Sequence, residues 1–556
     1  MKPKPCRNLF GLAAAAMSAA LAAAAAGVSA ARAASAYTPF PAASVAKTAL
    51  VTDAENRNAL SNEPGRAAAG VMLEFDLSAF AFARTPHARL NLGGVERVPV
   101  RRPGQSAGAA RCAMHVLAVA PGGAETLAGS LPGGGKKSCI VDVTDAVNAT
   151  LAAQPGGVGG GGGGAGGGGA KTIRLAVRLA GAPLPFEVYA LADAAAPALE
   201  LASPQGWPDD GCERIAPVTA GPVVYREACL AFAGGRDEES VLPLLYPAKK
   251  IIEVVLLGAG EKLREGKDWI LRDGRLVLPA GTAAPVQITD EFFLVERKDG
   301  QGNITKARGA VNLQEGGWYH ERQLEVTYEP AARDWHWPAA LSGIDDLPRA
   351  KKLLAAKAPL SVVVFGDSIS AGFNCSRIDG LWPYQQAYGE LVAGELRRVY
   401  GAPVTLMNHA SAGGTSGHGV TQAGAQVAWF KPDLVLLAFG MNERNEARRV
   451  AHRENMEKII DIVRARSPET EFVIITPMPN NPRWGGLDPV KFIRDEALKI
   501  RRPGIAHVDL TGTGIALLER KNYLDLSGNG ANHPNDFLHR IYAMRVLEVL
   551  LPRNNP

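Results

Sequence analysis

The chain has 556 residues, a length that predicts several domains rather than one hydrophobic core. Its apolar fraction of 47% is ordinary for a folded protein, and its formal net charge of +5 is small for this length. The composition therefore excludes a strongly basic surface for nucleic acid or anionic lipid, and we expect no nucleic-acid partner.

Residues 1–33 have the layout of a secretory signal peptide. Three basic residues (Lys2, Lys4 and Arg7) precede an Ala-rich apolar run, and small residues follow it at the spacing of a cleavage site. Removal of this segment takes away four basic residues and no acidic one, so the net charge falls to about +1. We expect bacterial-type export to a secreted or periplasmic location, with no membrane span after cleavage. A single membrane anchor is the alternative.

Five cysteines follow the expected cleavage site. In an oxidising compartment, Cys112 and Cys139 are one candidate disulfide pair and Cys212 and Cys229 are another, which leaves Cys375 unpaired. The spacing of these cysteines does not resemble that of a zinc site. We expect neither a metal ion nor a cofactor.

Residues 37–204 consist of short alternating apolar segments separated by Gly, Pro and Ala, a pattern typical of an all-β sandwich. A Gly-dominated stretch, residues 156–169, interrupts the pattern and predicts a flexible surface loop. The strands that we expect are residues 71–77, 114–119, 172–177 and 186–191.

Residues 205–330 predict a second β-rich accessory domain. Residues 251–256 and 323–328 alternate between apolar and polar side chains, as half-buried strands do. Trp318, Tyr319 and His320 precede the last of these strands; we interpret them as packing at a domain junction, with a sugar-binding platform as the alternative. Residues 331–358, together with the proline that follows them, contain three widely spaced prolines and predict a connector that ends in a short helix.

The periodicity changes at about residue 359, where β-branched runs begin to alternate with helical patterns. This alternation continues to the end of the chain and predicts a three-layer α/β domain with a parallel sheet over residues 359–556. The expected strands are residues 360–364, 404–407, 434–438, 472–476 and 506–510. The expected helices include residues 385–400, a helix that carries Met456 and Ile459, and a last helix over residues 536–551.

Small, polar turns follow the first three of these strands. They contain Ser368 after the first strand, a run from Asn408 to Gly414 after the second, and Asn442 after the third. His533 lies just before the last helix. Because the carboxyl ends of parallel strands meet at one edge of a sheet, these turns are expected to converge. Together they supply a hydroxyl, an imidazole and hydrogen-bond donors for an oxyanion, which is the set that acyl transfer needs.

These motifs, in this order, resemble those of the SGNH (GDSL-type) hydrolases over residues 360–552. Gly366-Asp367-Ser368 matches the nucleophile block, Asn408 to Gly413 the glycine block, Gly440-Met441-Asn442 the asparagine block, and His533-Pro534-Asn535 the histidine block. The resemblance implies a flavodoxin-like fold in which Ser368 is the nucleophile and His533 is the general base. It also implies oxyanion donors from the amides of Ser368 and Gly413 and from the side chain of Asn442.

The sequence departs from the family at the acid that orients the histidine. The family places Asp three residues before the histidine, and that position is Gly530 here. Asp536 is the candidate replacement, with a role as N-cap of the last helix as the alternative. Two further readings stay open: Asp536 and His539 keep the Asp-x-x-His spacing, and a backbone carbonyl acting on His533 would make a Ser–His dyad.

The β-rich residues 37–204 resemble the jelly-roll modules of secreted polysaccharide-active enzymes, through the strand end at residues 75–78 and the segment 141–147. Carbohydrate binding by this module and a spacer role are both open. We therefore expect an exported serine esterase that deacetylates a polysaccharide or another acylated carbohydrate. The alternatives are a lipid or thioester hydrolase and a non-catalytic carbohydrate-binding protein with a decayed hydrolase domain. The oligomeric state is not predicted.

Overall fold

A computed structural model describes the strands between residues 37 and 202, the single residues Val147 and Ile215, and residues 218–298, 304–308 and 311–552. The expected signal peptide, the Gly-rich loop and Cys112, Cys139 and Cys212 lie outside the described residues. Within the described part, no helix combines the length and the apolar character that crossing a membrane requires.

The strands between residues 37 and 202 form three antiparallel sheets with the orders β1-β13-β6-β10, β2-β5-β11-β8-β9 and β3-β4-β12-β7. Each of the four segments expected as a strand overlaps one of them (β5, β8, β11 and β12), while the packing of these sheets as a sandwich stays a prediction. The strands are β1 (Tyr37–Pro41), β2 (Ser44–Thr48), β3 (Val51–Thr52), β4 (Asn58–Ser61), β5 (Gly70–Asp76), β6 (Ala88–Asn91), β7 (Val95–Val98), β8 (Ala113–Val119), β9 (Glu125–Leu131), β10 (Ile140–Asp142), β11 (Thr172–Ala180), β12 (Val188–Leu191) and β13 (Ala198–Ala202).

Residues 218–330, which we call the β-rich region, are built around an antiparallel sheet with the order β14-β24-β17-β18. Short strands and turns connect its members, and α4 lies in the expected connector. The elements are β14 (Val224–Leu230), β15 (Phe232–Ala233), β16 (Ser240–Leu242), β17 (Ala248–Leu256), β18 (Glu261–Lys262), β19 (Ile270–Arg272), β20 (Arg275–Leu278), β21 (Gln287–Ile288), α3 (Thr289–Phe292), β22 (Leu294–Lys298), β23 (Ile304–Arg308), η1 (Gly316–Trp318) and β24 (Gln323–Pro330), followed by η2 (Ile344–Asp346) and α4 (Pro348–Ala355).

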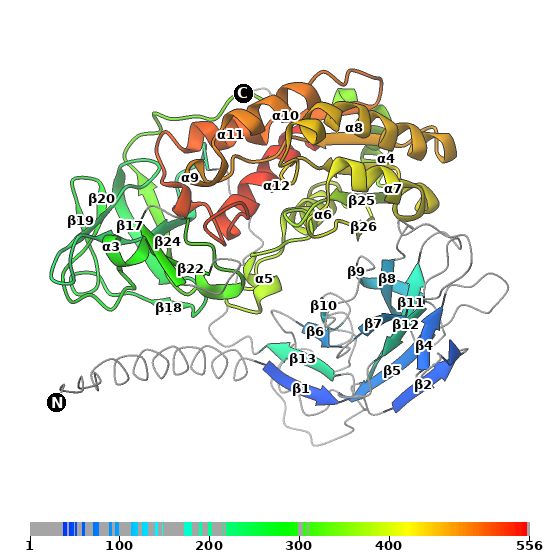
Figure 1. Cartoon of the computed structure of the whole chain (residues 1–556), viewed down its shortest axis with the longest axis horizontal. Helices are drawn as coiled ribbons and strands as arrows, with labels where there is room; N and C mark the ends of the chain where they lie inside the picture. Colours follow the sequence, from blue (N-terminus) through cyan, green and yellow to red (C-terminus); the bar gives the residue numbers. More distant parts are fainter. Residues whose placement is uncertain are drawn as a thin grey trace, which may run out of the picture.

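The remaining residues, 359–552, form the expected α/β domain with a five-stranded parallel sheet (Figure 1). Its strand order, β26-β25-β27-β28-β29, is the doubly wound order of flavodoxin-like folds. The elements are β25 (Leu360–Gly366), α5 (Ser376–Asp379), α6 (Tyr388–Tyr400), β26 (Val404–Asn408), α7 (Ser416–Gln426), η3 (Ala428–Phe430), β27 (Leu434–Ala438), α8 (Glu446–Arg466), β28 (Glu471–Ile475), α9 (Pro482–Gly485), α10 (Asp488–Ala497), β29 (Ile505–Val508), α11 (Leu510–Leu517), η4 (Tyr523–Asp525) and α12 (Asp536–Leu550).

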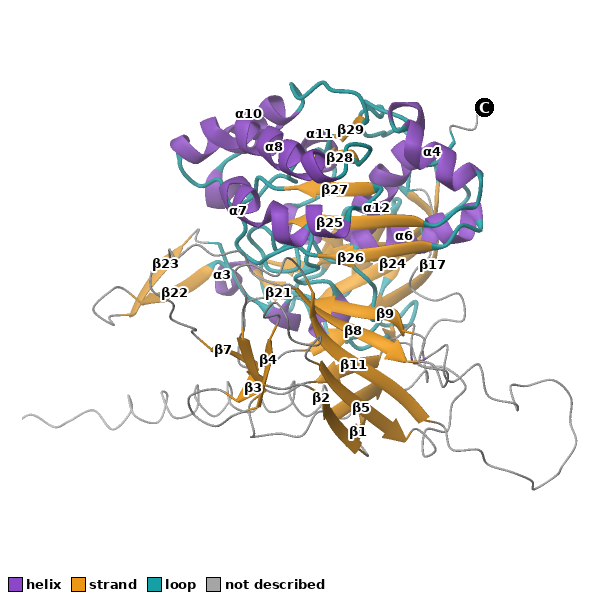
Figure 2. Ribbon diagram, turned by 90° about the vertical axis from the view of Figure 1, so that its right-hand side faces the viewer, coloured by secondary structure: helices purple, strands orange, loops and turns teal. Residues whose placement is uncertain are grey.

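Helices cover both faces of the parallel sheet, which confirms the three layers (Figure 2). Alternate residues of β25 belong to two different cores: Val362 and Val364 pack on the side of α6 and α12, and Val363 and Phe365 pack on the side of α7, α8 and α10. Because both faces are buried, the strands are continuous apolar runs rather than alternating ones.

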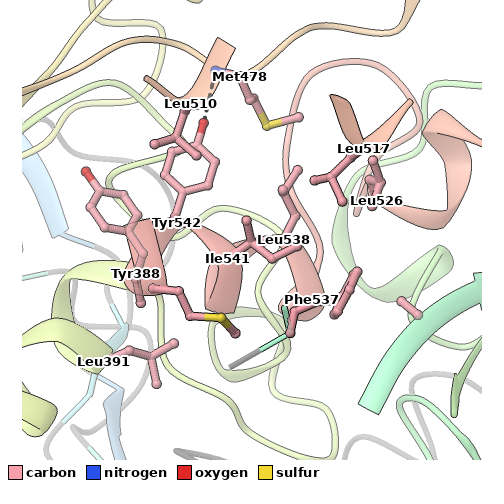
Figure 3. Packing of buried hydrophobic residues seen from close by; sticks show 14 of the residues in the cluster. Tyr388, Leu391, Met478, Leu510, Leu517, Leu526, Phe537, Leu538, Ile541 and Tyr542 are labelled. Atoms are coloured by element: carbon pink, nitrogen blue, oxygen red, sulfur yellow. Dashed lines mark hydrogen bonds between the residues drawn. The ribbon is translucent and has the colours of Figure 1, made fainter. Parts of the chain in front are cut away.

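Helix α12 is buried along almost its whole length. One side packs against α6 and the parallel sheet, and another contacts the β-rich region, so the core beneath it is continuous across the two regions. The backbone N–H of Met478 donates to the Tyr542 hydroxyl at 3.2 Å within this core. Figure 3 shows the packing around α12, with Tyr388, Leu391, Leu510, Leu517, Leu526, Phe537, Leu538 and Ile541.

Buried polar contacts also join the β-rich region to the α/β domain. The Lys521 ammonium lies 2.7 Å from the Glu227 carboxylate, and both side chains are fully buried. Arg226 pairs with Glu325 at 2.8 Å, and Arg540 of α12 lies 3.6 Å from the same carboxylate. A buried charge without a partner is strongly destabilising, so the Lys521–Glu227 and Arg540–Glu325 contacts favour the two regions staying together.

The expected pair between Cys212 and Cys229 is not formed. Cys229 is a buried free thiol, and its Sγ atom lies 3.3 Å from the Lys521 Nζ atom. Burial raises the pKa of this thiol to about 12, which keeps it protonated. Cys375 is buried and free, as the count of cysteines led us to expect.

Candidate active site

Ser368 lies in the turn that follows β25, at the carboxyl edge of the parallel sheet. The turn approaches β27 so closely that a Cβ atom on Gly366 would lie 2.3 Å from the Ala438 carbonyl oxygen. The Asp367 carboxylate accepts a hydrogen bond from the Ile369 amide at 3.1 Å and braces the turn. Burial raises the pKa of Asp367 to about 7. The serine itself is only 5% exposed.

His533 faces Ser368 across this edge. The Ser368 Oγ atom lies 2.9 Å from the His533 Nε2 atom, although the two residues are 165 positions apart in the sequence. At this distance the hydroxyl donates to Nε2 when the other ring nitrogen carries the proton. Such a pair can transfer the serine proton to the imidazole.

The other ring nitrogen of His533 lies 2.6 Å from the Asn374 Oδ1 atom. Asn374 occupies the turn after Ser368, with a left-handed φ of 60°. Its Nδ2 atom donates to the Gly316 carbonyl at 3.2 Å, which fixes Oδ1 toward the ring. Asn374 therefore accepts from Nδ1–H and selects the tautomer in which Nε2 is free to accept from Ser368.

A carboxylate from the β-rich region lies beside the same nitrogen. The Glu315 Oε2 atom is 3.7 Å from the His533 Nδ1 atom. The other carboxylate oxygen of Glu315 accepts from the Asn529 Nδ2 atom at 3.2 Å. The neighbouring His533 ring lowers the pKa of Glu315 below its usual value, against the opposing effect of partial burial.

The loop that carries His533 is organised by Asn529. Its Oδ1 atom accepts from three successive backbone amides, those of Ala531, Asn532 and His533, each at 3.0 Å. The Gly528 amide closes the loop by donating to the His533 carbonyl at 2.9 Å. This local network holds the imidazole in place without a helix or strand.

The other two expected oxyanion donors come from the turns after β26 and β27, the strands that flank β25 in the sheet. Asn442 is 6% exposed, and its Nδ2 atom donates to the Gly414 carbonyl at 3.0 Å, which leaves its second N–H available. Gly413 has a left-handed φ of 70°, in the turn after β26. Among the hydrogen bonds of the described residues, the amides of Ser368 and Gly413 have no protein acceptor. These are the donors that an oxyanion would need.

Glu443, the residue after Asn442, has a structural role. It accepts from the Ser416 amide at 2.7 Å, and its carboxylate lies 3.6 Å from the His452 ring. This contact ties the loop after β27 to the start of α7 and to α8. Glu443 therefore anchors the loop that presents Asn442.

The carboxylate of Asp536, the candidate acid for His533, contacts other groups. Its Oδ1 atom accepts from the Ser376 amide at 2.8 Å and lies 3.6 Å from the His320 Nε2 atom. The acceptors next to the His533 Nδ1 atom are Asn374 and Glu315 instead. Asp536 is not the N-cap of α12 either. The N-cap is Asn535, whose side chain accepts from the Leu538 amide, and Asp536 is the first helical residue.

His539, the partner of Asp536 in the alternative spacing, is fully buried inside α12 and stacks on Tyr388. Burial lowers the pKa of His539 to about 4. The histidine next to Ser368 is His533. His409 of the glycine block is likewise buried, and its ring bonds with the Gln426 carbonyl.

Sequence reasoning missed Glu315 and Asn374. Asn374 follows Ser368 closely but belongs to none of the four motifs, and Glu315 lies in another region of the chain. The one available signal was Gly530, because a glycine where an acid is expected implies that an acceptor comes from elsewhere.

Comparisons with known proteins support the sequence resemblance. Residues 364–541 match the family described as GDSL-like Lipase/Acylhydrolase. No curated protein matches the chain.

Several solved structures are similar to part of the chain. A two-domain esterase (CEX) active on acetylated mannans has 17% identity and a TM-score of 0.31, and the match covers 37% of this chain and 53% of that one. The chain thus spans about half the length of that esterase. A lipase/acylhydrolase from Enterococcus faecalis has 21% identity and a TM-score of 0.28, with 34% and 93% covered. Axe2, an acetylxylan esterase from Geobacillus stearothermophilus, has 16% identity and a TM-score of 0.28, with 34% and 94% covered.

The family match extends from the end of β25 to the middle of α12. It therefore includes the turns after β25, β26 and β27 and the loop that carries His533. This part of the chain therefore resembles a GDSL-like lipase/acylhydrolase domain, as its sequence motifs led us to expect.

Proposed function

We propose that the protein hydrolyses esters through an acyl-serine intermediate formed on Ser368. The single observation that supports this mechanism is the 2.9 Å contact between the Ser368 hydroxyl and the His533 Nε2 atom. A nucleophile and a base within hydrogen-bond reach, with the base held on its far side by a third group, are the parts that this chemistry requires.

The reaction follows from these positions. His533 Nε2 accepts the Ser368 proton as Oγ forms a bond to the ester carbonyl carbon, and the carbonyl electron pair moves onto oxygen. The amides of Ser368 and Gly413 and the Asn442 side chain stabilise this oxyanion. Collapse of the intermediate breaks the bond to the alcohol, which takes the proton from His533. Water then repeats the sequence on the acyl-serine and releases the acid.

The Ser368→Ala variant tests this mechanism. We expect it to lose at least about a thousandfold in kcat on p-nitrophenyl acetate, because the nucleophilic oxygen is gone. Ser370→Ala is the matched control, since its hydroxyl bonds to Tyr388 at 2.8 Å and takes no part in the proposed reaction. Retained hydrolysis by Ser368→Ala would exclude the acyl-serine mechanism, and a wild-type protein without esterase activity would favour the decayed-domain alternative.

The substrate that we propose is an acylated carbohydrate, with acetyl as the main acyl group. The support comes from the sequence: the layout of a signal peptide in residues 1–33 and the likeness of residues 37–204 to modules of polysaccharide-active enzymes. A series of p-nitrophenyl esters from two to twelve carbons, together with acetate release from an acetylated polysaccharide, separates a deacetylase from a lipid hydrolase. A preference for long acyl chains would contradict the proposal.

Export is part of the same proposal. Cleavage near residue 33 would place the enzyme outside the cytoplasm, where polymeric carbohydrates are accessible. N-terminal sequencing of the protein recovered from the periplasm or the medium tests this directly. An intact N-terminus in the membrane fraction would favour the anchor.

A further inference from the structure

The proposed mechanism leaves one requirement open on the far side of His533. When Nε2 takes the serine proton, the ring becomes a cation, and a serine hydrolase of this kind normally places a carboxylate beside Nδ1 to stabilise it. The acceptor in direct contact here is the neutral amide of Asn374, at 2.6 Å. An amide oxygen can select the tautomer, but it carries no net charge to balance the imidazolium.

The negative charge near Nδ1 comes from Glu315, in the segment of residues 311–322 that precedes β24. Its Oε2 atom lies 3.7 Å from Nδ1, within the range where an opposite charge stabilises a protonated ring. The side chain is 58% exposed, yet Asn529 holds one of its oxygens at 3.2 Å. The same Asn529 accepts from the His533 amide, so one residue fixes both the carboxylate and the histidine loop.

The segment that carries Glu315 also fills the space in front of Gly530. A Cβ atom on Gly530 would lie 2.1 Å from the Tyr319 hydroxyl oxygen and 2.4 Å from the Asn312 carbonyl oxygen. Gly530 also has a left-handed φ of 79°. An aspartate therefore does not fit at this position, and the residues that exclude it flank Glu315 on both sides.

The segment is anchored to the α/β domain on both sides of Glu315. The Gln314 amide donates to the Asn529 carbonyl at 3.1 Å, and the Gly316 carbonyl accepts from Asn374. Glu315 thus lies between two backbone contacts with the site, which restrict where its carboxylate can go.

We infer that Glu315 of the β-rich region is the residue that positions and charge-balances His533, acting beside Asn374 in place of the missing acid at Gly530. This inference rests on the proposed function, because it assigns the third member of the Ser368–His533 pair. It makes the hydrolase site a composite of two regions of the chain. In this arrangement Asn374 sets the tautomer, and Glu315 supplies the charge.

Other ionisable groups near His533 have to be considered in any pH experiment. Asp367 of the nucleophile turn interacts electrostatically with the ring, and so does His539 of α12. Asp367 is buried and braces the turn, and His539 has its pKa lowered to about 4 by burial. A variant of Glu315 leaves both in place, so it isolates the contribution of the exposed carboxylate.

The test compares the pH profiles of kcat/KM for the wild-type protein and Glu315→Gln with p-nitrophenyl acetate. The acid limb of this profile reports the general base of the free enzyme. Loss of the negative charge makes the imidazolium less stable, so we expect the limb to move to lower pH by about half to one pH unit after allowance for solvent exposure. We expect kcat to fall about threefold to tenfold, the equivalent of that displacement.

The double variant Glu315→Gln/Asn374→Asp provides a rescue. It places a carboxylate directly against Nδ1, and we expect it to be more active than Glu315→Gln and to have an acid limb at higher pH. Glu321→Gln is the matched control, because Glu321 lies in the same segment but pairs with Arg322. We expect its profile to match that of the wild-type protein.

Three results would overturn the inference. The first is a Glu315→Gln profile identical to that of Glu321→Gln, and the second is a fall in kcat with an unmoved acid limb. The third is a double variant no more active than Glu315→Gln despite an unchanged melting temperature. The proposed function has a separate test, the loss of hydrolysis in Ser368→Ala. If that loss is observed and one of these three results is also found, the role of Glu315 is excluded while the acyl-serine mechanism stands.

Discussion

The α/β domain and the β-rich region contribute to one site in different ways. The α/β domain places Ser368, Gly413 and Asn442 at consecutive strand ends, where the topology of a parallel sheet gathers them. The β-rich region contributes Glu315, which directly precedes η1 and is held by contacts with Asn529 and Asn374. The first contribution follows from the fold of one domain, whereas the second depends on how two regions pack.

The largest expected effect comes from breaking the contact between the regions. Lys521→Met leaves Glu227 without its ammonium partner at 2.7 Å, in a site with no solvent access. Removal of one partner of a buried ion pair costs about 3–5 kcal/mol, and we expect a loss of this size in the free energy of unfolding. Chemical denaturation provides the measurement.

Lys499→Met is the matched control for this experiment. Lys499 pairs with Glu496 on the surface, where its side chain is 54% exposed, and such pairs contribute about 0–1 kcal/mol. Equal losses in the two variants would mean that the buried contact does not hold the regions together.

The next effect is confined to the α/β domain. Asn442→Ala removes one of the three expected oxyanion donors, and we expect kcat to fall at least about a hundredfold with little change in KM. Glu443→Gln keeps the hydrogen bond from the Ser416 amide and tests the anchoring of the same loop. We expect a smaller loss from Glu443→Gln, and a larger one would mean that loop position matters more than the donor.

A third prediction concerns the space that the β-rich region occupies. Gly530→Asp returns the acid to the position where the family has it, but its Cβ atom would collide with Tyr319 and the backbone of Asn312. We expect a loss of about 2–3 kcal/mol in stability, from overpacking and from the left-handed backbone. Denaturation and esterase assays together check this. A stable and more active Gly530→Asp would show that the site still accepts the family's arrangement.

The difference between the two regions also explains what the sequence could predict. Runs such as residues 360–366 are apolar on both faces and end in small, polar turns, so the sheet, its layers and the position of Ser368 follow from local pattern. Gly530 indicates that an acid is missing, but no local pattern shows where a substitute lies. Glu315 becomes a candidate only when the packing of Tyr319 against Gly530 is known.

Asp536 illustrates why nearness in sequence was misleading. It follows His533 by three residues, but Asn535 starts α12 between them and turns the chain. The carboxylate at the first helical position then meets the Ser376 amide and the His320 ring instead of His533. The direction of a side chain at the start of a helix depends on which residue is the N-cap. The spacing of residues in the sequence does not reveal that direction.

The smallest expected effect concerns His320, which the β-rich region inserts between two carboxylates of the α/β domain. Its ring lies 3.6 Å from Asp536 and 3.7 Å from Asp379, and Glu325 also faces it. Burial opposes protonation, but these carboxylates outweigh it and raise the pKa of His320 above its ordinary value. Protonated His320 therefore stabilises the contact between the regions.

The direction of this pKa change fixes how stability depends on pH. A histidine whose pKa is raised on folding contributes stability that is fully present below about pH 6.5 and lost as the pH rises through the folded-state value. Each pH unit by which folding raises the pKa of a group contributes about 1.4 kcal/mol. We expect the wild-type protein to lose stability relative to His320→Gln as the pH rises above about 6.5, measured by denaturation at each pH. Parallel curves for the two proteins would mean that His320 is neutral in the folded state, and that the regions are held together by Lys521 and the arginine pairs without it.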